Sequence, residues 1–175
     1  AGRLRVMNRW YPQLFVDALE MGTQATYFFT PSVEPVNPHY PSFGRKWWAE
    51  FAKDHAAAFD ARGWRYYTGD YFDDWYPGYS NSWAAYRGSI GILYEQGGVM
   101  WHGIARPYGR VMTYRQTVHH QLTSTLANLR TLSERHEEIK REWIEARRSW
   151  VDPEGIFADR SYALLPDGND QRLRD

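Results

Sequence analysis

The sequence predicts an α/β fold, with part of a twisted mixed β-sheet flanked by helices and a long helix towards the C-terminus. Short apolar or aromatic runs recur along the first part of the chain, and glycine and proline separate them. One helical pattern lies between two of these runs, and a longer one follows the last of them. A length of 175 residues suits one domain with its own core.

The strands are predicted by four runs, at residues 14–19, 26–30, 64–68 and 88–94. A short polar lead precedes the first run. Apolar side chains then recur at helical spacing over residues 42–62, with Ser42 as N-cap and Gly63 at the other end. His55 lies on the apolar face of that helix, so we expect it in the core rather than on a metal. Residues 69–87 mix Tyr and Trp with Gly, Pro, Asn and Asp, which predicts a long ordered loop.

Two of the predicted strands end in the same way. Glu20 follows the first run and precedes Gly22, and Glu95 follows the last run and precedes a pair of glycines. We therefore expect both strand ends at one edge of the sheet, where open α/β sheets have their binding crevice. The alternative is that Glu95 simply meets solvent at the end of a strand.

A helical pattern extends over residues 113–150. Val118, Leu122, Leu126 and Leu129 recur at intervals of four, four and three, so this face is expected to dock on the sheet. An unbroken helix of this length would measure about 57 Å at 1.5 Å per residue, so a break or a protruding end is expected. Pro153 ends the pattern.

Composition and motifs exclude several classes of function. The 21 basic and 21 acidic residues balance, so neither nucleic acid nor a membrane is expected as a partner. The chain has no cysteine, and its histidines, including the adjacent His119 and His120, have no zinc-site spacing. The sequence has no GxGxxG or P-loop motif, so a nucleotide cofactor is not expected, and it has no GxSxG motif that would support a nucleophilic serine. Carboxylates at strand ends remain, namely Asp17, Glu20 and Glu95. Together with the aromatic loops as sugar platforms, they leave glycoside hydrolysis open.

Four segments, VDALEMG, ATYFFTPSVEPVNP, FDDWYPGYSNSW and GILYEQGG, follow one another in this order. Their order and spacing resemble the zinc carboxypeptidases, in particular a group of large bacterial members, over about residues 12–135. The resemblance implies that residues 1–150 form the C-terminal half of a catalytic domain that removes C-terminal residues from peptides. It also implies that the N-terminal half lies outside this chain, and that residues 151–175 start a linker or a following domain.

The resemblance assigns roles to a few residues. Glu95 takes the position of the general base. Tyr76, or alternatively Tyr79, takes that of the mobile tyrosine that closes on the substrate's C-terminal carboxylate. Leu19 stands where the family has a zinc-binding His, and the family's upstream HxxE and substrate-binding arginines have no counterpart here.

Because leucine cannot bind zinc, this chain alone is expected to hold none and to be inactive. Two alternatives stay open, a non-catalytic peptide-binding module and a carbohydrate-active protein. The family resemblance is compatible with a secreted or periplasmic location.

Overall fold

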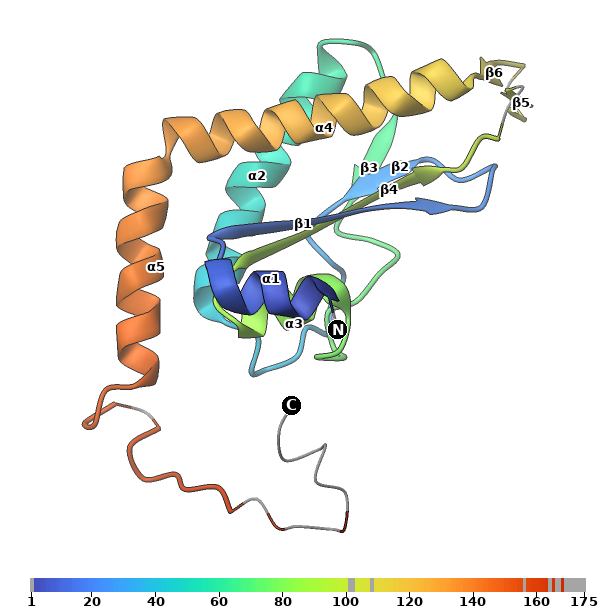
Figure 1. Cartoon of the computed structure of the whole chain (residues 1–175). Coiled ribbons are helices and arrows are strands. Elements are labelled where there is room, and N and C mark those ends of the chain that lie inside the picture. The colour runs from blue at the N-terminus through green and yellow to red at the C-terminus, as the bar shows by residue number, and fades with distance from the viewer. Residues whose placement is uncertain are drawn as a thin grey trace.

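The computed structural model describes residues 2–100, 103–107, 109–155, 157–163, 165 and 168. The fold is α/β, with a mixed four-stranded sheet in the order β1-β4-β2-β3 (Figure 1). Its strands are β1 (Leu14–Met21), β2 (Tyr27–Phe29), β3 (Tyr66–Thr68) and β4 (Ile90–Gly97). A separate hairpin consists of β5 (Ile104–Ala105) and β6 (Val111–Met112). The helices are α1 (Gly2–Trp10), α2 (Ser42–Asp60), α3 (Ser80–Tyr86), α4 (Tyr114–Glu134) and α5 (His136–Trp150).

The long pair β1 and β4 forms the centre of the architecture. These strands are parallel and pair without a gap, from Leu14 with Ile90 to Met21 with Gly97. The predicted meeting of two strand ends at one edge is therefore confirmed. β2 runs antiparallel to β4, and β3 runs parallel to β2.

Helices cover both faces of this sheet. α2 and α4 lie on one side, and α1 and α3 lie on the other (Figure 1). The main core lies on the α2 side, where aromatic and β-branched side chains from the sheet meet those of the helices. Its buried members are Tyr27, Phe29, Phe43, Trp47, Phe51, Phe59, Ile90, Ile92, Tyr94 and Ile139.

The predicted C-terminal helix is broken, as expected. α4 begins after Thr113, whose hydroxyl accepts from the Gln116 N–H in a capping box, and Arg135 separates it from α5. The prediction for its docking face is wrong. Val118, Leu122, Leu126 and Leu129 are 46–55% exposed, whereas the buried face is mostly polar. It contains Thr117, His120, Thr123, Ser124, Ala127, Asn128 and Thr131.

Hydrogen bonds explain the polar docking face of α4. The Ser124 hydroxyl lies 2.5 Å from the Tyr27 hydroxyl, and the Thr125 hydroxyl lies 3.0 Å from that of Tyr94. Aromatic hydroxyls buried against the helix need polar partners, and small hydroxyl residues provide them. His55 belongs to the same layer, because its ring lies 3.2 Å from the Ser124 carbonyl oxygen. It is 1% exposed, which confirms it as a core histidine.

Three elements differ from the sequence prediction. The expected polar lead forms α1, the expected loop at residues 69–87 contains α3, and the hairpin β5–β6 lies in a segment predicted to be loop. Pro41 is the N-cap of α2 and Ser42 its first residue, with no side-chain cap. Gly63 turns the chain after α2 with φ of 63°, as predicted. None of the helices among the described residues is long and apolar enough to cross a membrane.

Candidate functional site

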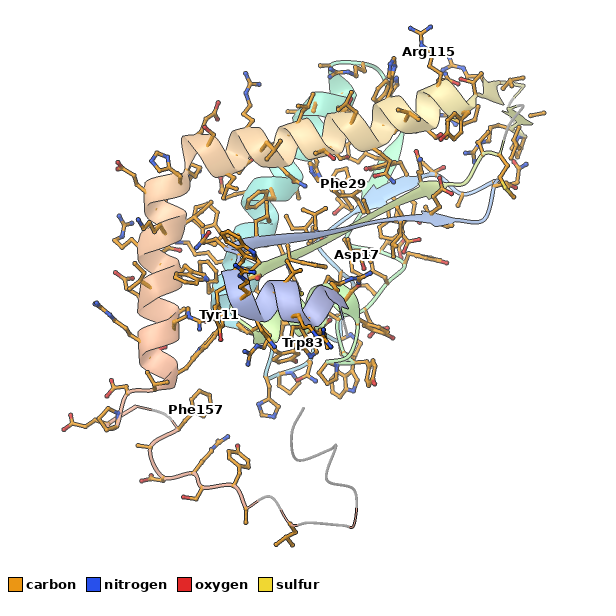
Figure 2. All side chains as sticks on the ribbon, in the orientation of Figure 1. Tyr11, Asp17, Phe29, Trp83, Arg115 and Phe157 are labelled. Carbon is orange, nitrogen blue, oxygen red and sulfur yellow. The ribbon has the colours of Figure 1, made fainter. Side chains whose placement is uncertain are left out.

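The candidate site lies on the sheet face opposite α4. Side chains alternate along a strand, and paired residues of neighbouring strands point to the same side. Ile90, Ile92 and Tyr94 face the core, so Glu95 points to the opposite face. Its partner across β1 is Leu19, which is 42% exposed. Asp17 shares this face, and Figure 2 shows it on the side of the sheet towards α3, opposite Phe29.

Asp17 is held by the first residue of α3. It is 9% exposed, and the Ser80 hydroxyl donates a hydrogen bond to its Oδ2. Burial raises the pKa of Asp17 above its ordinary value, and the positive charge of Arg3 on α1 opposes that rise. The carboxylate of β1 is therefore hydrogen-bonded to α3 and feels the charge of a residue on α1.

Glu95 has the electrostatics expected of a proton acceptor. Burial is the largest cause that raises the pKa of this half-buried carboxyl, and the negative charge of Asp17 raises it further. A carboxylate whose pKa moves towards neutral pH accepts a proton more readily than an ordinary surface Glu. Two carboxylates on one face, each with a raised pKa, are also a frequent arrangement in catalytic sites.

An aromatic wall borders Glu95 on the β2 side. Phe28 is the antiparallel partner of Glu95 and is fully buried. The rings of Phe72, Tyr67 and Tyr71 lie 5.1, 5.4 and 5.6 Å from its ring. Burial raises the pKa of Tyr67, and Glu95 is among the nearby negative charges that add to this rise. The wall is thus an apolar surface with one phenol close to the carboxylate.

The tyrosines predicted to bind substrate lie in the loop before α3. Tyr76 is 59% exposed and Tyr79 is 44% exposed, and their rings meet edge to face at 5.4 Å. Tyr79 immediately precedes Ser80, the residue that hydrogen-bonds Asp17, so it is connected directly to the carboxylate layer. Tyr76 lies three residues further from that anchor.

The loop is fixed from the inside by Asp74, which the sequence analysis did not single out. This side chain is 1% exposed and accepts hydrogen bonds from Asn81 Nδ2 at 2.6 Å and Ser82 Oγ at 2.8 Å. Burial raises the pKa of Asp74, and these hydrogen bonds act in the opposite direction. An acid followed seven and eight residues later by Asn and Ser was the only signal in the sequence.

The donor atoms around Glu95 do not fit a zinc ion. The residue paired with Glu95 is Leu19, which has no atom that can bind a metal. His55 and His120 pack in the core layer on the other side of the sheet. The His55 ring contacts Phe29, and the His120 ring contacts Phe59. His119 is exposed on α4. In the part of the chain that the structure describes, no three His, Cys, Asp or Glu side chains form a metal-binding group.

Comparisons with protein-family models, with curated proteins and with solved structures found no match to this chain.

Proposed function

We propose that this chain is a carboxypeptidase-like domain that binds the C-terminal end of peptides and does not hydrolyse them on its own. The observation that carries the proposal is the pairing of Leu19 with Glu95 on one sheet face. Glu95 occupies the general-base position of the resemblance, and Leu19 occupies the position of a metal ligand. Residues 1–150 would then be the C-terminal half of such a catalytic domain, and residues 151–175 would start a linker or another domain.

The residues of this chain have separate roles under the proposal. Glu95 accepts a hydrogen bond or a proton from a group bound over the ends of β1 and β4. The exposed rings of Tyr76 and Tyr79 provide the contact surface for the peptide. Zinc is the metal that the family resemblance implies, and no step is assigned to it because the donor set does not fit.

Binding and turnover can be measured together on the whole chain. A fluorescent peptide with a free C-terminus is titrated with wild type and with Tyr76→Ala, Tyr79→Ala and Tyr114→Ala. Tyr114 is a 58% exposed tyrosine on α4 and is the matched control. The two loop variants should bind about tenfold more weakly, which corresponds to about 1.4 kcal/mol, and the control should bind normally.

Three results would contradict the proposal. The first is equal affinity in all variants, and the second is stoichiometric zinc in the purified chain. The third is cleavage of the peptide by the chain alone, detected by mass spectrometry.

A carbohydrate-active protein is the second candidate. It is supported by the raised pKa of both Asp17 and Glu95 on one face, next to exposed aromatic rings. Cleavage of an aryl glycoside that is lost in Glu95→Gln would favour this candidate. No cleavage by wild type would remove it.

The proposal also places the N-terminal half of the catalytic domain beside β1, which is an edge of the described sheet. The Gln13 and Met21 carbonyl oxygens accept hydrogen bonds from the amides of Ile90 and Gly98. Because the backbone groups of successive strand residues point in alternate directions, those of the even-numbered residues between Gln13 and Met21 point away from β4. The amides of Val16, Ala18 and Glu20 should therefore exchange with solvent rapidly. Slow exchange at all three would show that this edge is already covered.

A further inference from the structure

A pocket of about 570 Å³ lies at the carboxyl end of β4, on the sheet face that α4 covers. It is formed by the start of β2, the end of β4, the hairpin β5–β6 and the first turns of α4, which come together in Figure 1. Its volume is in the range of small-molecule sites, about 300–1,000 Å³. Glu95 points to the opposite face, so the pocket is separate from the candidate site above.

The lining of this pocket carries positive charge. Arg65, Arg106 and Arg110 line it, and no Asp or Glu is among its lining residues in the described part of the chain. Burial and the charge of Arg106 hold the pKa of His120 at about 4, so this ring is neutral at pH 7. The arginines therefore set the charge of the pocket.

Arg106 is positioned before any ligand arrives. Its Nη1 donates to the Ala25 carbonyl oxygen at 2.7 Å. Its Nη2 lies so close to the backbone of Gly97 that an added Cβ there would be 2.7 Å away. The Nε of Arg106 is buried without a hydrogen-bond partner among the described residues. A guanidinium fixed in this way is prepared to donate to an oxyanion.

Gln96 is a second buried group with a missing partner. It is 4% exposed and lines the pocket, and its Oε1 has no hydrogen-bond partner in the described chain. Leaving such an acceptor unpaired is unfavourable, because the group has lost its contact with water without gaining another partner. A ligand that donates a hydrogen bond to Gln96 would recover this cost.

We propose that the pocket binds a small organic oxyanion, a carboxylate or a phosphate carried on a flat or apolar group. Arg106 and Arg110 bind the oxyanion, and Gln96 Oε1 is the acceptor for a ligand that carries a hydroxyl or N–H group besides the oxyanion. The rings of Trp64 and His120, 4.4 Å apart, form the wall for its apolar part.

Calorimetric titration of the whole chain with benzoate, benzamide and inorganic phosphate tests the proposal. Benzoate or phosphate should bind saturably and lose affinity as salt is added, whereas benzamide, which has the same ring without the oxyanion, should bind at least about tenfold more weakly than benzoate. Tighter benzoate binding identifies a carboxylate ligand, and tighter phosphate binding identifies a phosphate ligand. Binding of neither anion below about 10 mM overturns the proposal.

Variants locate the binding. Arg110→Gln, at an exposed position, and Arg106→Gln should each weaken the anion about tenfold or more. Arg130→Gln is the matched control, because Arg130 lies on α4 outside this pocket. Far-ultraviolet circular dichroism checks that each variant is folded. If Arg106→Gln is unfolded, the result for Arg110→Gln alone decides the test. Anion binding that is equal in Arg110→Gln and wild type also overturns the proposal.

Discussion

Replacing Gly91 by Ala should destabilise the protein strongly, because β4 and α3 touch backbone to backbone at this glycine. A Cβ there would lie 2.3 Å from the Asn81 carbonyl oxygen and 3.0 Å from its carbon. An ordinary contact begins at 3.4 Å, so α3 would have to move by about 1 Å. Overpacking of this kind costs about 1–3 kcal/mol. The shift also strains the hydrogen bonds from Asn81 and Ser82 to the buried Asp74, each worth about 1.5–3 kcal/mol.

The expected loss is therefore about 3 kcal/mol or more, a large share of the 5–15 kcal/mol typical of a domain. Urea unfolding followed by tryptophan fluorescence measures it, because the chain has nine tryptophans. Gly22→Ala is the matched control, since nothing lies within 4 Å of its added Cβ. That variant should stay within about 0.5 kcal/mol of wild type. An equal free energy of unfolding for Gly91→Ala and Gly22→Ala would refute the reasoning.

Three further predictions concern charge and burial. The pKa of His120 is about 4 instead of 6.5, so the unfolded chain binds more protons in this window and stability falls as the pH drops through it. His120→Phe should flatten this fall in urea unfolding from neutral pH down to about pH 4, and an unchanged slope would contradict it.

The pKa of Glu95 is raised above 4.5, so the folded chain binds more protons just above that pH and stability falls as the pH rises. Glu95→Gln should remove that fall and melt higher at neutral pH; a lower melting temperature would argue against a desolvated carboxylate. Leu122→Ala should cost less than about 0.5 kcal/mol and Ile139→Ala about 2–5 kcal/mol, because Leu122 is 50% exposed and Ile139 is 1% exposed. Equal losses would mean that the leucine face of α4 is buried after all.

The sequence predicted the strands well because each is a short apolar run between turn residues. It also predicted α2, whose apolar side chains follow one helical face. α3 escaped prediction because its seven residues, SNSWAAY, lie among Tyr, Pro and Gly and bury mainly small side chains. Ala84 and Ala85 are fully buried, so close approach to β4 stabilises this helix rather than any hydrophobic pattern.

The face of α4 could not be predicted from hydrophobic spacing. Leucines at intervals of three and four normally face the core. Here the aromatic side chains beneath the helix carry hydroxyls at their tips, and Ser124 and Thr125 are their partners. Only the tertiary contacts show that Tyr27 and Tyr94 end at this helix. The same matching leaves the leucines exposed.

Half of the candidate site was visible in the sequence. The shared strand-end pattern predicted that Glu20 and Glu95 lie at one edge, and the two strands do end side by side. The register pairs Glu20 with Gln96 and Leu19 with Glu95, so Glu20 points to the opposite face, and Asp17 is the carboxylate that shares the face of Glu95. The role of Asp74 depends on a short helix that was not predicted. The arginine pocket was equally out of reach, because Arg65 and Arg106 line the same pocket only when β3 and the hairpin flank the same end of the sheet.

The two faces of the sheet thus carry different side chains, because successive residues at the end of each strand point to opposite faces. On β4, Glu95 lies on the same sheet face as Asp17, and the next residue, Gln96, faces the arginine pocket. A one-residue slip of β4 would exchange them, placing a carboxylate among arginines and an amide beside Asp17. Gly91 and Gly97 oppose that slip, because each is in a contact that no side chain could occupy. The glycines of β4 therefore fix the register on which both proposed sites depend.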